Sequence, residues 1–108
     1  MKDITTVELK ELIDKGEDFV LLDCRSRQRY NTEHLPGAIN LPVDTITKEE
    51  VSKILPDKST LLVTSCGGIT CSTSIKCYEK LKSLSYTNVV EYYGGLAEWK
   101  AHGFETIK

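Results

Sequence analysis

Cysteine thiols are the side chains of this chain best suited to chemistry, and two of them lie in one glycine-containing segment. Residues 60–74 read TLLVTSCGGITCSTS, which places Cys66 and Cys71 in a Cys-x4-Cys arrangement. An apolar run precedes the first thiol and a helical pattern follows the second. A thiol in this position can be a nucleophile, an inert buried group, a metal ligand or one half of a redox pair.

The position of Cys66 between a strand and a helix favours the nucleophile. Residues 60–63 form a continuous apolar run, which is typical of a strand buried on both faces, and the pattern predicts a helix from about residue 73 to residue 84. Glycines allow the backbone N–H groups of the loop to converge, and the N-terminus of the helix adds a positive dipole end. Both features stabilise a thiolate and lower a cysteine pKa below its usual value of about 8.5. Glycine-rich loops of this kind also bind phosphates without any thiol chemistry.

The metal and redox alternatives depend on the other thiols. A structural zinc site needs a second close pair of ligands, whereas Cys24 and His34 each stand without a paired neighbour. Cytosolic conditions disfavour a permanent disulfide between Cys66 and Cys71, but a transient one remains open, with Cys71 as the resolving thiol. Cys77 falls on the apolar stripe of the predicted helix, and we expect it in the core.

Helices and strands alternate along the chain, which predicts an α/β domain with a mostly parallel sheet of about five strands over residues 1–108. Thr5 with Glu8, and Thr47 with Glu50, have the spacing of capping boxes that open helices. Ligands of such sheets bind beyond the carboxyl ends of the strands. The expected strands include residues 19–22, 60–63 and 88–92, and Cys66 follows the second of these.

The composition argues against some classes of binding partner and indicates a location. The 108 residues carry a formal net charge of −2, and the isoelectric point is near 5.7, so neither nucleic acid nor an anionic membrane is an expected partner. No segment has the apolar run of a signal peptide or the roughly 20 apolar residues of a membrane span. We therefore expect a cytoplasmic protein.

Several ordered segments of the chain resemble the rhodanese-like domain family. The resemblance covers nearly the whole chain, and the motifs GYxNV and GGxxxW of that family have counterparts in Ser85–Val89 and Gly94–Trp99. Val63–Cys66 stands where the family has a strand and then its catalytic cysteine. The remaining matching segments are FVLLDCR from Phe19, which resembles LLDVR, and YNTEHLPGAINLP from Tyr30, which resembles EYxxGHIPGAINIP.

The resemblance implies a sulfurtransferase. In this family the catalytic cysteine, here Cys66, takes the sulfane sulfur of thiosulfate or of a persulfide donor, and a thiol or cyanide then accepts it. The acceptor thiol can belong to a protein, and no cofactor or metal is implied. Asp23 and Arg25 are expected to support the pocket structurally. The loop residues carried over as the lining of the pocket are Gly67, Gly68, Ile69, Thr70, Cys71, Ser72 and Thr73.

The loop departs from the common family pattern Cys-x-x-Gly-x-Arg-Ser. Counted to Ser74 it is two residues longer, and it resembles instead a family variant written Cys-x-Gly-x-x-Cys. No Arg or Lys occurs from Cys66 through Ile75, so hydroxyl groups replace the usual charge, and Lys76 is expected to point to solvent. Weakened thiosulfate activity and no phosphatase activity are the expectations. The alternative is a non-catalytic module that senses oxidation or soft metals with Cys66 and Cys71.

Overall fold

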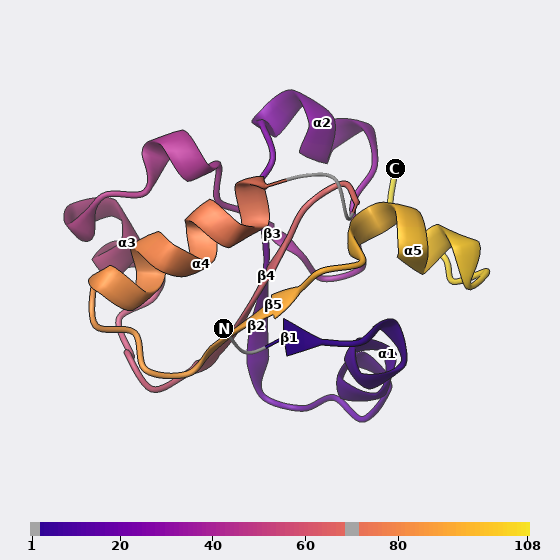
Figure 1. Ribbon diagram of the computed structural model, residues 1–108, viewed down its shortest axis with the longest axis horizontal. Coiled ribbons are helices and arrows are strands. Elements are labelled where there is room, and N and C mark those ends of the chain that lie inside the picture. The colour runs from indigo at the N-terminus through magenta and orange to yellow at the C-terminus, as the bar shows by residue number, and fades with distance from the viewer. Residues whose placement is uncertain (1–2, 69–71) are drawn as a thin grey trace.

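The described residues form a five-stranded parallel sheet with helices on both of its faces (Figure 1). The computed structural model describes residues 3–68 and 72–108. The strands lie in the order β1-β5-β4-β2-β3, and every neighbouring pair is parallel. The predicted α/β class is confirmed. The strands are β1 (Asp3–Ile4), β2 (Phe19–Asp23), β3 (Ile39–Asn40), β4 (Leu61–Ser65) and β5 (Val89–Tyr92).

The helices lie in two layers, with α3 and α4 on one face of the sheet and α1 and α5 on the other (Figure 1). Helix α2 lies at one end of the sheet, beyond its strands. Within the described ranges, no helix has the length and apolar content that crossing a membrane requires. The helices are α1 (Thr6–Asp14), α2 (Arg27–Thr32), α3 (Lys48–Ile54), α4 (Thr73–Ser83) and α5 (Gly95–Ala101), with a 3-10 turn at Val43–Thr45.

The two central strands, β2 and β4, are buried on both faces, as their apolar runs predict. Leu22 and Leu62 point into the cluster covered by α3 and α4. Leu21 and Val63 point into the cluster covered by α1 and α5. Because successive side chains of a strand point to opposite faces, one run of apolar residues supplies both halves of the core. This double burial fixes the position of the two strand ends that carry Cys24 and Cys66.

Side-chain caps begin two of the helices at the predicted residues. The Thr5 hydroxyl accepts a hydrogen bond from the Glu8 N–H at 3.2 Å, and the Glu8 carboxylate accepts one from the Thr5 N–H at 3.0 Å. Thr47 accepts a hydrogen bond from the Glu50 N–H at 3.2 Å at the start of α3. Each cap satisfies a backbone donor that the helix itself leaves without a partner.

Two elements were not predicted from the sequence, strand β1 and helix α2. Helix α2 contains no buried residue, so it has no apolar stripe to reveal it. The Ser26 hydroxyl begins this helix by accepting a hydrogen bond from the Arg29 N–H at 3.4 Å. Strand β1 is only two residues long and pairs with β5 at Asp3 and Ile4. A pattern of two residues is too short for any periodicity to appear.

Helix α5 begins in direct contact with the segment that carries Cys66. The Leu96 N–H donates to the Cys66 carbonyl at 3.0 Å, and the Ala97 N–H donates to the Gly67 carbonyl at 2.9 Å. Gly95 has a φ of +65°, and a Cβ there would lie 2.7 Å from the Cys66 carbonyl oxygen and 2.7 Å from the Gly68 nitrogen. Both the backbone angle and the close approach therefore require glycine at this position.

We expect Gly95→Ala to destabilise the protein more than Gly103→Ala does. Both glycines have positive φ, but a Cβ at Gly103 would meet nothing within 4 Å. Each substitution carries the left-handed penalty of roughly 1–2 kcal/mol, and only Gly95→Ala adds a backbone clash of about 1–3 kcal/mol. Urea denaturation of both variants measures the difference in the free energy of unfolding. Equal losses would show that the Cys66 segment moves aside at no cost.

Candidate active site

Two cysteines follow neighbouring strands at the carboxyl edge of the sheet. Asp23 and Ser65 are register partners at the ends of β2 and β4, and Cys24 and Cys66 each follow directly. The Cys24 N–H donates to the Ser65 carbonyl at 3.0 Å. The site therefore lies where a parallel α/β sheet is expected to bind its ligand.

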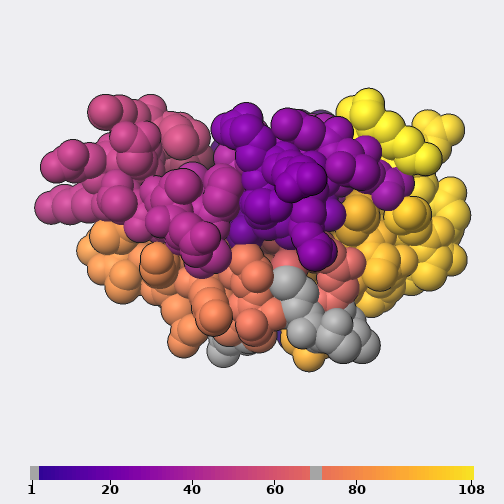
Figure 2. Space-filling model, turned by 90° about the horizontal axis from the view of Figure 1, so that it is seen from above, coloured from indigo at the N-terminus to yellow at the C-terminus, as the bar shows by residue number. Residues whose placement is uncertain are grey.

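An open cleft of about 840 Å³ lies beside these two cysteines. Figure 2 looks down on this end of the molecule and shows residues of α2 (violet), the end of β4 (salmon) and the start of α4 (orange) next to one another. The volume is in the range of small-molecule sites. The described residues that line the cleft are Cys24, Arg25, Ser26, Arg29, Pro42, Val43, Asp44, Cys66, Gly67, Gly68, Thr73, Lys76 and Ala97.

Cys66, the predicted nucleophile, lines this cleft and is 4% exposed. It is disulfide-bonded in the structure, whereas Cys24 and Cys77 are free thiols. Nucleophilic chemistry therefore requires the reduced form of Cys66.

The other predicted loop residues divide into three groups. Gly67, Gly68 and Thr73 line the cleft. Ser72 is exposed and is the N-cap residue of α4, and it is not among the cleft-lining residues. The remaining predicted loop positions, Ile69, Thr70 and Cys71, lie outside the described residues.

The start of α4 supplies backbone donors at the cleft. Its N-cap residue, Ser72, makes no side-chain capping hydrogen bond, so it leaves the N–H groups of the first turn without that partner. Thr73, the first residue of α4, lines the cleft. These N–H groups and the positive end of the helix dipole favour an anion at this position, either a thiolate or an oxyanion.

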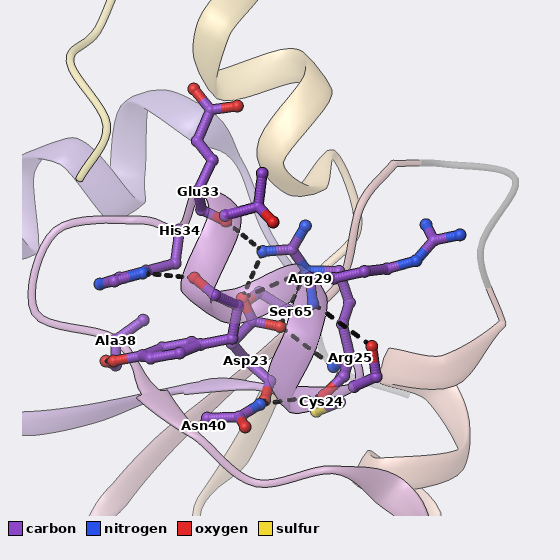
Figure 3. Close-up of polar contacts among 12 residues, drawn as sticks. Asp23, Cys24, Arg25, Arg29, Glu33, His34, Ala38, Asn40 and Ser65 are labelled. Atoms are coloured by element: carbon purple, nitrogen blue, oxygen red, sulfur yellow. Dashed lines mark hydrogen bonds and ion pairs between the residues drawn. The ribbon is translucent and has the colours of Figure 1, made fainter. Parts of the chain in front are cut away.

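Asp23 and Arg25 form a two-pronged ion pair with each other at the base of α2 (Figure 3). The Arg25 Nε donates to Asp23 Oδ1 at 3.0 Å, and Nη2 donates to Asp23 Oδ2 at 2.7 Å and to the Glu33 carbonyl at 2.6 Å. The Asn40 side chain donates to the carbonyls of Asp23 and Arg25 at 3.1 and 2.9 Å. The Arg25 guanidinium is thus occupied by its bonds to Asp23 and to the Glu33 carbonyl, which hold the end of β2 in place. The Arg25 side chain also lines the cleft.

Arg29 and Lys76 bring positive charge to the cleft from outside the loop. Both side chains line it, Arg29 from α2 and Lys76 from the second turn of α4. Figure 3 shows the Arg29 side chain extending away from the Asp23–Arg25 pair. Lys76 is exposed, as expected, but it also lines the cleft. Sequence reasoning missed Arg29, because it looked for a cation only within the loop; the signal available was the arginine-rich stretch RSRQR after the buried strand at residues 19–22.

Cys24 lines the cleft as a buried, neutral thiol. It is 1% exposed, and burial raises the pKa of the Cys24 thiol well above its usual value, with a hydrogen bond to Cys77 acting in the same direction. A neutral thiol is a poor nucleophile. Of the two thiols beside the cleft, Cys66 is therefore the better candidate once reduced.

His34 is not among the residues that line the cleft. Its Nδ1 lies 2.8 Å from the Tyr30 carbonyl, and its ring stacks on the Tyr30 ring with centroids 3.9 Å apart. Within the described ranges, no group of three or more His, Cys, Asp or Glu side chains is placed to hold a metal ion.

Comparisons with known proteins identify related chains with the same fold. The thiosulfate sulfurtransferase/rhodanese-like domain-containing protein 3 of Mus musculus is 32% identical, over 91% of this chain and 68% of its own length. Thiosulfate sulfurtransferase PspE of Escherichia coli is 35% identical, over 71% of this chain and 70% of its own. Other relatives are much longer: this chain spans 25% of a probable molybdopterin-synthase adenylyltransferase of Porphyra purpurea, to which it is 32% identical.

The solved structures and the family comparison agree with these relatives. The solution structure of the rhodanese-like domain of the Anabaena protein Alr3790 superposes with a TM-score of 0.85 at 32% identity, covering 99% of this chain and 79% of that one. The model of the rhodanese-like domain family matches residues 5–102. The sheet order, the cysteine at the end of β4 and the ordered sequence segments thus have one explanation: this chain belongs to the rhodanese-like domain family.

Proposed function

We propose that this protein is a sulfurtransferase that carries sulfane sulfur as a persulfide on Cys66. The observation that carries the proposal is the position of Cys66 at the end of β4, in a cleft that also receives the open start of α4 and two cationic side chains. A thiolate and an anionic donor both require such surroundings. The relatives named as thiosulfate sulfurtransferases support the same class of reaction.

The reaction has two displacement steps. The Cys66 thiolate attacks the outer sulfur of thiosulfate, the S–S bond of the donor breaks, and sulfite leaves with the bonding electron pair. The enzyme then holds a Cys66 persulfide. A thiolate or cyanide attacks its terminal sulfur, the persulfide S–S bond breaks, and the Cys66 thiolate is restored. One sulfur atom is transferred in each step, and no external oxidant or reductant is consumed.

Arg29 and Lys76 are assigned the attraction and orientation of the anionic donor. The loop motif of this chain lacks the arginine of the common family pattern, and these two side chains supply positive charge to the same cleft. Arg25 contributes less, because its guanidinium is already bonded to Asp23 and to the Glu33 carbonyl. A charge-assisted hydrogen bond to a sulfonate-like oxygen contributes roughly 1.5–3 kcal/mol.

The partners in this proposal are a small sulfur donor, thiosulfate or a persulfide, and a thiol acceptor that is either a small molecule or a protein. The reaction needs a reduced Cys66, and cytosolic conditions keep thiols reduced. We therefore propose that the protein acts in the cytoplasm.

The first test is the formation of a sulfur adduct on Cys66. Reduced protein, freed of reductant, is incubated with thiosulfate, and its intact mass is measured together with thiocyanate formation from cyanide. We expect a gain of about 32 Da, the mass of one sulfur atom, in the wild type. The adduct and the thiocyanate should both be lost in Cys66→Ser. Cys24→Val is the matched control, because it removes the other described thiol that lines the cleft.

Three results would contradict this assignment. No adduct on the wild type with thiosulfate or a persulfide donor would remove sulfur transfer as the function. An adduct that persists in Cys66→Ser but is lost in Cys71→Ser would move the chemistry to the other loop thiol. Loss of the adduct in Cys24→Val alone would move it to the end of β2.

Arg29→Ala should weaken thiosulfate turnover. We expect kcat/KM for thiosulfate to fall about 10- to 100-fold, the equivalent of one charge-assisted hydrogen bond. Arg27→Ala is the control, because Arg27 is exposed on the same helix and is not among the cleft-lining residues. Steady-state thiocyanate assays at constant ionic strength measure both variants. Equal effects of the two substitutions would show that general surface charge, rather than the position of Arg29, attracts the donor.

The disulfide at Cys66 favours a second candidate, a module that senses oxidation through its loop thiols. The sequence pairs Cys66 with Cys71 for this role, and Cys71 lies outside the described residues. The same mass measurement separates the two functions. A sensor would show a reversible loss of about 2 Da on mild oxidation, the two hydrogens of a dithiol, and no sulfur adduct from the reduced protein.

A further inference from the structure

Glu91 is a buried carboxyl group beside β4 and the start of α4 that the proposed reaction does not use. It lies in β5, which is flanked by β1 and β4, and the residue is 1% exposed. Its Oε1 accepts a hydrogen bond from the Ser74 hydroxyl at 3.1 Å. Its Oε2 is buried and has no hydrogen-bond partner among the described residues. Buried polar atoms of this kind are rare enough in native proteins to require an explanation.

A second unpartnered oxygen lies on the neighbouring strand. Thr64 is 0% exposed, and its hydroxyl is also buried without a hydrogen-bond partner in the described part of the chain. Thr64 and Glu91 are direct register partners in the parallel pair of β4 and β5. Register partners point to the same face of a sheet and are separated by one strand spacing, about 4.8 Å. The two side chains that carry the unpartnered oxygens are therefore neighbours on one face of the sheet.

The surroundings of Glu91 favour its neutral form. Burial raises the pKa of the Glu91 carboxyl above its usual value; the hydrogen bond from Ser74 acts against this, and the negative charge of Asp3 on β1 acts with it. From β4, Thr64 is uncharged. From α4, the buried residues are Ser74, Cys77 and Leu81, and none of them is a cation. A carboxylate at this position would have one hydrogen bond and no counter-charge among the described residues, which is costly.

A proton on Glu91 gives each of these oxygens a role. The neutral acid keeps Oε1 as the acceptor for Ser74 and gains an O–H donor at Oε2. The Thr64 hydroxyl is the nearest unpartnered acceptor across the strand pair. A small side-chain rotation or one bridging water spans the distance between them.

Thr64 and Ser74, the two residues beside Glu91, lie before and after Cys66 in the sequence. Thr64 lies in β4, two residues before Cys66. Ser74 lies in the first turn of α4, one residue after Thr73, which lines the cleft. A link from Thr64 through Glu91 to Ser74 therefore connects the strand that leads into the loop with the helix that leaves it.

We propose that Glu91 is a positioning residue which, as a neutral acid, joins β4 to the start of α4 and so holds the end of β4 that carries Cys66 in place relative to α4. It accepts from Ser74 and donates to Thr64, directly or through one water. Its effect on sulfur transfer rests on the proposed function, whereas its effects on stability and on the reactivity of Cys66 do not. Loss of the proton would place an uncompensated negative charge beside β4 and oppose the Cys66 thiolate.

The first experiment follows stability against pH. Because the pKa of Glu91 is raised in the folded protein, folding favours the protonated form, and the extra stability is present at low pH. That stability is lost as pH rises from the usual glutamate pKa through the raised one. Urea denaturation across about pH 5 to 8 should show this fall in the wild type. The fall should be absent in Glu91→Gln, which keeps an acceptor and a donor but cannot ionise, and present in the control Glu79→Gln, an exposed residue of α4.

The second experiment measures how readily Cys66 reacts with iodoacetamide in reduced protein on a Cys71→Ser background. We expect Glu91→Leu to lower the alkylation rate at neutral pH about fivefold or more, because β4 and the start of α4 are no longer joined. The pH profile of the reaction should also shift upward. Glu91→Gln should restore the rate. Thr64→Val is the second variant if Glu91→Leu fails to fold, because it changes the core less. It removes only the acceptor of the Glu91 proton and should also lower the alkylation rate.

The outcomes separate this proposal from the proposed function. The positioning role is wrong if Glu91→Gln keeps the pH-dependent loss of stability, or if Thr64→Val and a folded Glu91→Leu both react at the wild-type rate. If the stability and alkylation results are as expected but no sulfur adduct forms on the wild type, the positioning role stands and sulfur transfer falls.

Discussion

The site depends on one close backbone contact, in which the start of α5 supports the strand end that carries Cys66. The N–H groups of Leu96 and Ala97 donate to the carbonyls of Cys66 and Gly67. This approach is possible only because Gly95 has no side chain and adopts a positive φ. The carbonyls of Cys66 and Gly67 thereby point toward the start of α5. Residues nearly 30 positions apart thus determine the shape of one loop.

The positive charge at the cleft comes from side chains outside the loop, whereas the common family motif has an arginine within it. The stretch from Cys66 through Ile75 contains no cation, and Arg29 approaches from α2 and Lys76 from α4. Arg29 can face the cleft because the Asp23–Arg25 ion pair and the Asn40 side chain hold the end of β2, from which α2 departs. A cation on a separate helix leaves the loop free to differ in length and sequence.

Beside β4 and the start of α4, a buried polar row replaces apolar packing. Ser74 of α4 donates to Glu91, which lies beside Thr64 in the sheet, and the proton that we propose on Glu91 would serve the two unpartnered oxygens. A buried carboxyl group contributes little to stability by itself. The Glu91 carboxyl group lies between β4 and the start of α4, and both elements determine where the Cys66 sulfur lies. Its proposed role is therefore to position the sulfur.

The sequence by itself determined the class of fold and the family, and Cys66 is the nucleophile that it predicts. Apolar runs such as residues 19–22 and 60–63, and the cap at Thr5, depend on interactions within a few neighbouring positions, so they can be recognised locally. The tertiary structure alone decided that Arg29 lines the cleft, that Cys24 and Cys66 line the same cleft, and that Glu91 lies between Thr64 and Ser74. Helix α2 contains no fully buried residue, so no local apolar pattern reveals it. Strand register and helix placement bring these residues together across long separations, and no spacing along the chain encodes those distances.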